Sequence, residues 1–473
     1  MSVAERLSEN LDAVNEYERE PVPEKKVKGF KSFLGLVSGE HIAGTEFVIG
    51  PLFVLHGTAW SDLFWGLLVG NILATLSWVC LCAPTAVKTR LTIYYQLEKI
   101  AGFNLVSIFN VLNGLLFCVA AAAMIGVSGT AIGYMLGVDM PGLTDLMPGS
   151  LEAMAIVFVI GTVMALVSTW GYDFVSKFSL IFAPWMPFIF LGAGIAMLPQ
   201  LGLTQWSDFW TIAETKIWTG IPVEGQSKYG FWHVLIFAWL CNSAMHIGLS
   251  DMTIYRYAKK PHYGIASAAG MFIGHFMAWV ASGILCAVAI QAGNNNPSSG
   301  EIAVMSIGIA GGICVLIAGW TTANPTVYRA GIAVQALFPN SKRWKITLGI
   351  GLLATALACF PWIISKLDQF LGFYALVAAP VGAMVLADVW LFPRLGLVQN
   401  FADFRKLKFN YAVALAWVLS IAVSYGLYLA FQADFFFFMA LPAWLIAGVL
   451  YVGFAKLMQN GLQASTATLQ VEA

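Results

Sequence analysis

The chain has 473 residues, of which 59% are hydrophobic and only 11% are charged. A soluble protein of this length carries about a quarter charged residues, so the composition excludes an ordinary soluble domain and indicates a polytopic membrane protein. The 25 Lys and Arg balance 25 Asp and Glu, and this zero net charge leaves no basic footprint for nucleic acid.

The N-terminal segment is polar and mixed in charge. Residues 1–29 contain no apolar stretch of the kind found in a signal peptide, so we expect a cytoplasmic tail. The seven cysteines lie in apolar runs without the spacing of a zinc site, and we interpret them as small apolar residues. No cofactor is expected.

Twelve apolar runs are long enough to span a bilayer. They fall near residues 30–56, 60–84, 105–137, 150–170, 174–199, 230–255, 263–292, 302–336, 345–363, 367–392, 410–431 and 434–457. With twelve spans, all but three of the 25 Lys and Arg fall on one side, and the exceptions are Lys216, Lys228 and Lys366. Because basic residues favour the cytoplasmic side, both termini are predicted in the cytoplasm and the chain in the plasma (inner) membrane.

No soluble domain interrupts these runs. The predicted parts of the chain are a cytoplasmic tail, a first group of five spans, an external interfacial segment, a second group of five spans, two additional spans and a C-terminal cytoplasmic tail. They cover residues 1–29, 30–199, 200–229, 230–392, 393–457 and 458–473, respectively.

Spans 1 and 6 are poor helices with polar centres. Span 1 carries Glu40, His41 and Glu46 among four glycines and a proline, and span 6 carries Asn242 and His246. Ionisable residues in a span usually face a cavity or a partner, and a broken helix frees backbone groups for ligands. A simpler interpretation of span 1 is that residues 30–46 are an interfacial approach. Paired interruptions at the start of two five-span halves instead favour an inverted-repeat transporter with a midplane site.

Span 3 contributes Asn113 and Phe117. Asn113 is as well suited to bridging two helices as to contacting a ligand. We interpret His275 of span 7 as a packing residue. Trp239 of span 6 and Phe117 are the stacking candidates for an aromatic solute. The hydrogen-bonding candidates are Asn242, His246, Asn113, Glu40 and His41.

Span 8 carries the sequence from Ala318 to Tyr328, AGWTTANPTVY, with two adjacent threonines inside an apolar run. Lipid offers no hydrogen-bond partners, so these hydroxyls must be satisfied within the protein. They can bond a neighbouring helix, or they can contribute oxygen ligands for a small hard cation.

Four stretches make the chain resemble the nucleobase–cation symporter family, which includes cytosine permeases and hydantoin and allantoin transporters. They are YEREPVP before span 1, SDMTIYRYA after span 6, AGWTTA in span 8 and APVGAMVLAD at the end of span 10. The resemblance implies an all-α fold with a five-plus-five inverted repeat, the leucine-transporter-like fold, and two further helices. It also implies alternating access and, in several members, sodium coupling.

The resemblance places sodium between the break in span 1 and span 8. The matching positions in span 8 are Ala318, Thr321 and Thr322, and the candidate carbonyls in span 1 are those of Gly39 and Ile42. Glu40, His41 and Glu46 depart from the family pattern, and they suit a cationic solute, ring nitrogens or a coupling proton.

We therefore expect a cation-coupled symporter that imports a nucleobase or a related small nitrogen-containing solute, with Na⁺ as the coupling ion and H⁺ as the alternative. Its partners are a small molecule and the lipid bilayer, and the sequence leaves its oligomeric state open. A proton-coupled transporter of another polar or cationic solute is a second hypothesis. A membrane enzyme is a hypothesis of another class, but the chain has no HExxH spacing, and Glu40 and His41 are adjacent in sequence, so they do not share one helical face. A channel is a third, which broken helices around a single site disfavour.

Overall fold

The computed structural model describes residues 11, 16–294 and 296–459. Of the predicted N-terminal tail it covers residue 11 and residues 16–29, and nearly all of the predicted C-terminal tail lies outside the described residues. In this part of the chain the regular structure is helical, apart from two isolated β-bridges. The expected all-α fold class is confirmed.

Each predicted span coincides with a helical region. In chain order these regions are α2 (Phe30–His41) with α3 (Glu46–Leu55), α4 (Trp60–Ser77) continuing through the π-helical turn η2 (Trp78–Cys82) into α5 (Ala83–Thr89), α7 (Phe103–Met135), α8 (Leu151–Ser168), α9 (Tyr172–Phe182) with α10 (Met186–Met197), α12 (Phe231–Leu240) with α13 (Ser243–His246) and α14 (Met252–Tyr255), η8 (Ala269–Phe276) with α15 (Met277–Gln291), α17 (Ile309–Gln335), α18 (Arg343–Ala358), α20 (Leu367–Leu386), α23 (Tyr411–Ala430) and α24 (Ala440–Met458).

Among the described residues, eight continuous helical segments are long and apolar enough to cross a membrane. Large apolar side chains on their outer faces are exposed, for example Phe188 at 75% and Val449 at 73%. A soluble protein rarely leaves so many of these side chains in water, so this surface is in contact with lipid. The chain is an integral membrane protein.

Several short helices were not predicted from the sequence. They include α6 (Ile93–Ala101), α11 (Phe209–Ile212), α16 (Ser299–Ile307) and α22 (Phe401–Arg405). The apolar run at 302–336 is therefore two helices, separated at Gly308, whose positive φ of 64° ends α16. These helices are too short to produce a spanning hydropathy signal. Local capping marks α16, where the Ser298 hydroxyl accepts a hydrogen bond from the Glu301 amide at 3.0 Å, but α11 and α22 have no side-chain cap.

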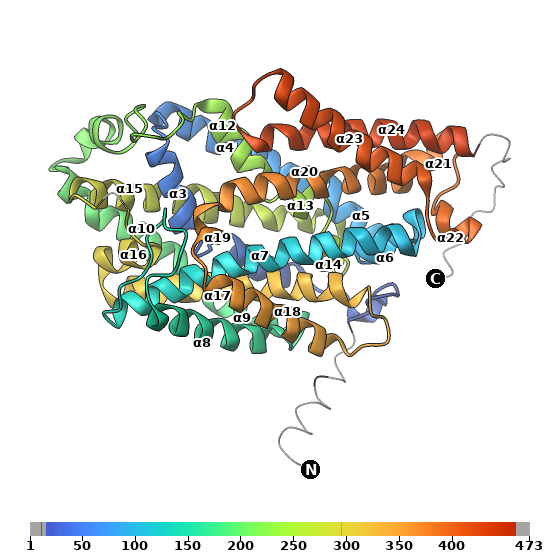
Figure 1. Ribbon diagram of the computed structural model, residues 1–473, viewed down its shortest axis with the longest axis horizontal. Helices are drawn as coiled ribbons and strands as arrows, with labels where there is room; N and C mark the ends of the chain where they lie inside the picture. Colours follow the sequence, from blue (N-terminus) through green and yellow to red (C-terminus); the bar gives the residue numbers. More distant parts are fainter. Residues whose placement is uncertain (1–10, 12–15, 295, 460–473) are drawn as a thin grey trace, which may run out of the picture.

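The long helices run along the long axis of the molecule (Figure 1). α7 and α17 pack tightly together, and a Cβ atom at Gly319 would come within 2.0 Å of the Ser128 hydroxyl. α23 and α24 lie side by side along one edge, against α20 (Figure 1). This arrangement leaves α2, α3, α13, η8 and α17 to meet in the middle of the bundle.

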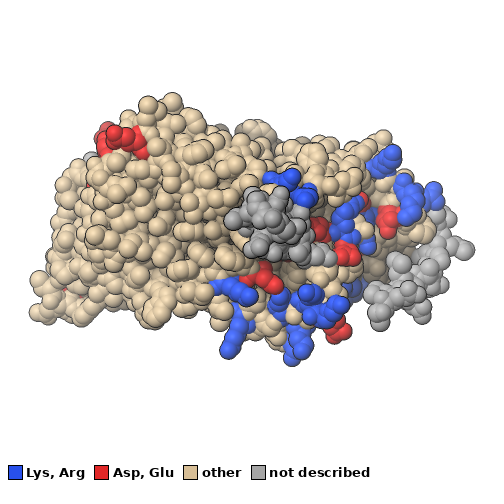
Figure 2. Space-filling model, turned by 90° about the horizontal axis from the view of Figure 1, so that it is seen from below, with Lys and Arg blue, Asp and Glu red and all other residues tan. Residues whose placement is uncertain are grey.

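Charge is distributed unequally between the two ends of the bundle. On the face in Figure 2, Lys and Arg side chains gather toward one end and the remainder is almost uncharged. We call this the basic end; α5, α6 and α22 lie there (Figure 1). The segment 200–229, predicted as external, lies at the other end, drawn in green at the left of Figure 1. The orientation in the cell stays a prediction.

Candidate functional site

The break predicted in span 1 is present. α2 ends at His41, Ile42 has the non-helical angles φ −105° and ψ 64°, and α3 begins at Glu46. A helix end leaves its last carbonyls without intrahelical partners. Gly274 of η8 allows span 7 to approach the break, because a Cβ atom there would come within 2.0 Å of the His41 carbonyl oxygen. The simpler interpretation, in which residues 30–46 only approach the membrane, does not fit this buried break.

Span 6 is also interrupted. α12 ends at Leu240, α13 is a single turn, and Leu249 has a left-handed φ of 64°. A buried leucine with positive φ is strained, and the surrounding turn must hold it. The Asp251 amide donates to the Met245 carbonyl at 3.1 Å, which helps to direct the Asp251 side chain into the bundle.

The freed carbonyls of span 1 face the two threonines of span 8. The Thr321 hydroxyl lies 3.0 Å from the carbonyl oxygens of both Gly39 and Ala318. The Thr322 hydroxyl lies 2.8 Å from the Ala318 carbonyl oxygen, 3.3 Å from that of Glu40 and 3.5 Å from that of Gly39. All of these groups are oxygens, as a hard cation requires. We call this set the oxygen cluster.

The expected sodium ligands are therefore largely together. Gly39, Ala318, Thr321 and Thr322 meet in the oxygen cluster. The carbonyl of Ile42 is not among the partners of these hydroxyls in the described part of the chain, and that of Glu40 is. The difference arises because α2 continues to His41, so the carbonyls that face span 8 lie earlier than Ile42.

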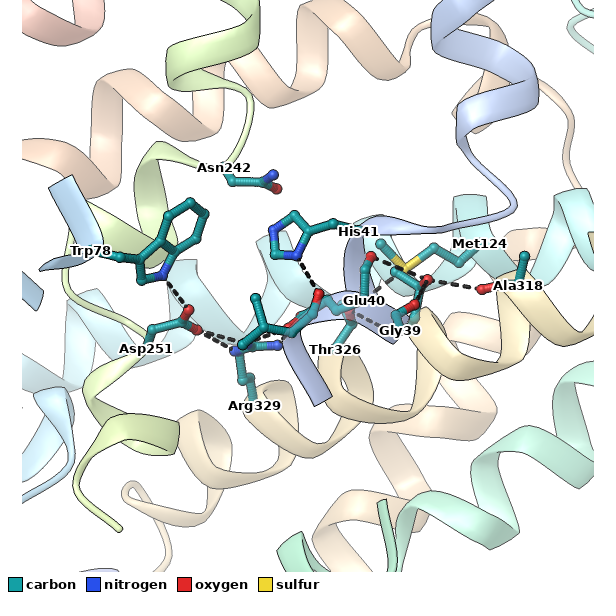
Figure 3. A network of polar contacts seen from close by, with 12 residues as sticks. Gly39, Glu40, His41, Trp78, Met124, Asn242, Asp251, Ala318, Thr326 and Arg329 are labelled. Atoms are coloured by element: carbon teal, nitrogen blue, oxygen red, sulfur yellow. Dashed lines mark hydrogen bonds and ion pairs between the residues drawn. The ribbon is translucent and has the colours of Figure 1, made fainter. Parts of the chain in front are cut away.

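Next to the oxygen cluster is a buried network centred on Arg329 of α17. Its guanidinium donates two hydrogen bonds to Glu40, one of them at 3.0 Å, and two to Asp251, at 2.5 and 3.0 Å. The Trp78 indole donates to the other Asp251 oxygen at 2.7 Å. Figure 3 shows Arg329 between the two carboxylates. This network joins the breaks in spans 1 and 6 to span 8.

A central cavity lies against both the oxygen cluster and this network. The volume that the centre of a water molecule can occupy in this cavity is about 60 Å³, which is enough for a small solute. Its lining comes from spans 1, 3, 6, 7, 8 and 10. The polar lining residues are Glu40, Thr45, Glu46, Asn242, His275, Thr322, Thr326 and Tyr374. Thr322 and Glu40 thus belong both to the cavity wall and to the oxygen cluster.

Three of the predicted solute-binding residues line this cavity: Phe117, Asn242 and Glu40. The Phe117 ring packs edge-on to Tyr374 with centroids 5.5 Å apart, and the Arg329 guanidinium lies over the ring, 5.9 Å from its centroid. Asn242 Nδ2 lies 3.4 Å from His275 Nε2. Glu40 lines the cavity with its carboxylate held by Arg329.

Four other predicted solute-binding residues lie outside the lining. The Trp239 indole donates to the Ser77 hydroxyl at 3.0 Å, and His246 Nε2 is bonded to the Trp239 carbonyl at 2.9 Å. Asn113 connects two tyrosines of α6 and α20, which corresponds to the helix-bridging interpretation. His41 Nδ1 donates to the Val37 carbonyl at 2.7 Å, within its own helix.

Two residues matter more than the sequence suggested. His275, interpreted as a packing residue, lines the cavity together with Glu46. Arg329 was counted only in the charge asymmetry between the two sides. Its position inside the apolar run at 302–336 was an available signal, because a charge within a span usually has a functional partner.

The basic end of the site is closed by a second network. The buried carboxylate of Glu16 accepts hydrogen bonds from the Tyr257 and Tyr328 hydroxyls, both at 2.8 Å, and from the Tyr172 amide at 2.9 Å. The Arg256 guanidinium donates to the Glu16 carbonyl at 2.5 Å. Through these contacts, Glu16 connects the N-terminal part of the chain to spans 5, 6 and 8.

At the opposite end, a wider hollow of about 440 Å³ lies next to the central cavity. We call it the vestibule. It is lined by Val48, Asp368 and Asp434 among others, while the neighbouring residues Ile49 and Leu367 line the central cavity. A thin apolar barrier formed by α3 and α20 therefore separates the two hollows.

No family model and no curated protein matches the chain. Solved structures do. Mhp1, a nucleobase-cation-symport-1 family transporter, in a closed conformation with bromovinylhydantoin bound, has a TM-score of 0.70 at 14% identity, covering 94% of this chain and 96% of that chain. The inward-facing conformation of Mhp1 has a TM-score of 0.64 at 15% identity, covering 92% and 93%.

A Na⁺-coupled sialic acid symporter, in a substrate-bound outward-open state, has a TM-score of 0.67 at 15% identity, covering 96% of this chain and 94% of that chain. These neighbours are transporters, in agreement with the expectation that the chain is not an enzyme. The chain has the fold of these symporters, and its resemblance to the nucleobase–cation symporter family is confirmed at the level of the fold.

Proposed function

We propose that this chain is a cation-coupled symporter that moves a small nitrogen-containing solute across the membrane by alternating access. The observation that carries the proposal is the sharing of Thr322 and Glu40 between the oxygen cluster and the wall of the central cavity. Ion and solute would then be bound by the same part of the protein, so each would favour the conformation that the other favours.

Na⁺ is the proposed ion, held by the carbonyl oxygens of Gly39, Glu40 and Ala318 and by the hydroxyls of Thr321 and Thr322. When bound, it would supply positive charge between two spans that move relative to each other. These residues now satisfy each other through hydrogen bonds, and breaking those bonds lets span 1 separate from span 8. The neighbours named above include a Na⁺-coupled symporter, which supports this ion.

A nucleobase or related heterocycle is the leading solute class, because the sequence resembles that family and because Mhp1 binds a hydantoin. Phe117 would stack on the ring, and Asn242 would bond to its edge. We also propose that the basic end, with both termini, faces the cytoplasm. The vestibule would then open outward, and the Glu16 network would close the inner side.

The test is thermal unfolding of the purified protein in sodium and in potassium at equal ionic strength. An ion that binds only the folded state stabilises it, by about 2.7 kcal/mol at 100 times its Kd. We expect sodium to raise the unfolding midpoint above that in potassium, and Thr322→Val to abolish this difference. Thr355→Val is the matched control, because the buried Thr355 hydroxyl donates a hydrogen bond within its own helix, to the Gly351 carbonyl at 2.8 Å.

Uptake into proteoliposomes completes the test. A sodium gradient should drive accumulation of a labelled nucleobase, hydantoin or related solute, and a sodium ionophore should abolish it. Equal stability in sodium and potassium, together with uptake driven by a proton gradient, would replace Na⁺ by H⁺ as the coupling ion. Passive equilibration without any gradient dependence would contradict the symporter.

A further inference from the structure

The central cavity contains a carboxylate that the protein leaves without a charged partner. Glu46, in the first turn of α3, is 1% exposed and lines the cavity. Its Oε2 atom has no hydrogen-bond partner within residues 11, 16–294 and 296–459. A buried polar atom is rarely left in this condition unless a ligand completes it.

The basic groups near Glu46 are engaged elsewhere or lie too far away. Among the described residues that line the cavity there is no Lys or Arg. Arg329, the nearest guanidinium in the network, already divides its donors between Glu40 and Asp251. Because one arginine serves two carboxylates there, it has no charge to spare for a third.

His275 does not neutralise Glu46 either. Its Nε2 atom lies 3.9 Å from Glu46 Oε1, which is beyond hydrogen-bonding distance. The Asn242 side-chain amide lies 3.4 Å from the same Nε2, closer than the Glu46 carboxylate does. His275 Nδ1 has no partner in the described part of the chain. The ring stacks on Trp279 with centroids 4.3 Å apart, which fixes its plane.

We propose that Glu46 binds a positively charged nitrogen group of the transported solute, so that the substrate is a small organic cation of the amidinium, guanidinium or ammonium class. The inference rests on the proposed transport function and names its substrate class. A monocation would pair with the Glu46 carboxylate and complete Oε2, whereas a neutral solute supplies no charge and the buried group would have to take up a proton instead.

The surroundings fit such a solute. Tyr374 brings an aromatic ring to the cavity wall, and a desolvated cation binds favourably over such a ring. Phe117 also lines the cavity, but the Arg329 guanidinium already lies over its ring, 5.9 Å from the centroid. The vestibule is lined by two carboxylates, Asp368 and Asp434, and by one ammonium group, Lys366, so a cation entering it meets one more acidic than basic side chain. Ser282 donates to the Glu46 carbonyl at 2.7 Å and helps to hold the first turn of α3 in place.

The experiment uses ligands of equal shape and different charge, with the purified full chain in sodium. Acetamidinium, acetamide and acetate form one series, and benzamidinium, benzamide and benzoate form a larger aromatic one. We expect the amidinium of at least one series to raise the unfolding midpoint, and its neutral and anionic counterparts to bind at least tenfold more weakly. Glu46→Gln should weaken amidinium binding at least tenfold, and the exposed Glu152→Gln should leave it unchanged.

Two controls keep the outcomes distinct. Stabilisation of Glu46→Gln by sodium would show that this variant is folded with its ion site intact. Asp434→Asn tests whether the cation binds in the vestibule instead of the central cavity, and we expect this variant to retain amidinium binding.

Three results would overturn the inference. The first is equal binding of the amide and the amidinium. The second is an amidinium affinity of Glu46→Gln that stays within twofold of the parent protein. The third is loss of amidinium binding in Asp434→Asn alone. Sodium-dependent binding of a neutral heterocycle that is indifferent to Glu46→Gln would overturn this substrate class while leaving the symporter standing.

Discussion

Glu40 and Glu46 lie six positions apart in the same interrupted span, both are buried, and their surroundings are opposite. Glu40 accepts two hydrogen bonds from Arg329, which also holds Asp251. Glu46 has one oxygen without a partner among the described residues and faces the cavity. A satisfied buried charge supports the fold, whereas an unsatisfied one lowers stability and persists where a ligand uses it. Glu16, whose carboxylate is bonded by neutral donors, is intermediate.

The largest effect should come from removing the shared partner of Glu40 and Asp251. Arg329→Met keeps the bulk of the side chain but leaves two carboxylates buried without a cation. We expect the free energy of unfolding to fall by about 3–5 kcal/mol, measured by denaturation in detergent. Arg405→Met, at an exposed arginine of α22, should change it by less than about 0.5 kcal/mol. Similar losses in both variants would show that the network does not hold the breaks together.

Glu40→Gln should have the next largest effect. The amide keeps the shape but gives up the charge and one of the two acceptor oxygens facing Arg329, so we expect a loss of about 2 kcal/mol. The same denaturation measurement detects it. A loss smaller than that of Glu16→Gln would mean that Asp251 alone satisfies Arg329.

Glu16→Gln tests the network with neutral donors. One oxygen remains to accept from the tyrosine hydroxyls, so we expect a loss of about 1 kcal/mol. Because this network closes the basic end, the variant should also expose Tyr257 and Tyr328 more often, which hydrogen exchange of the surrounding amides would detect. Unchanged exchange would separate the Glu16 contacts from closure of that end.

Glu46→Gln should have the smallest effect on stability, because no hydrogen bond to Oε2 is lost. We expect the free energy of unfolding to fall by no more than about 0.5 kcal/mol or to rise. This result would contrast directly with Glu40→Gln, which changes the same residue type in the same span. If Glu46→Gln destabilised as strongly as Glu40→Gln, Glu46 would have a partner in the folded state and the contrast would fail.

The comparison also shows which features sequence reasoning can reach. The breaks in spans 1 and 6 were predicted because glycines, a proline and charges interrupt apolar runs, and these are local properties. α6 was missed because a short helix in a connection has no spanning signal, and α16 was not separated from α17 because one apolar run covers both. Trp239 and Asn113 have the residue types of ligand-binding groups, but their side chains bond Ser77 and two tyrosines instead. Residue type alone does not reveal which face of a helix looks into the cavity.

The sequence by itself determined the class of protein, the regions of the long apolar helices and the two interruptions, because hydropathy and helix breaking depend on neighbouring residues. It also identified Thr321 and Thr322 as oxygen donors, because lipid cannot satisfy a hydroxyl. Only the tertiary structure decided that Arg329 pairs with Glu40, 289 positions away, while Glu46 faces the cavity without an arginine partner among the described residues. One guanidinium has a limited number of donors, and which carboxylates receive them depends on how the broken helices pack.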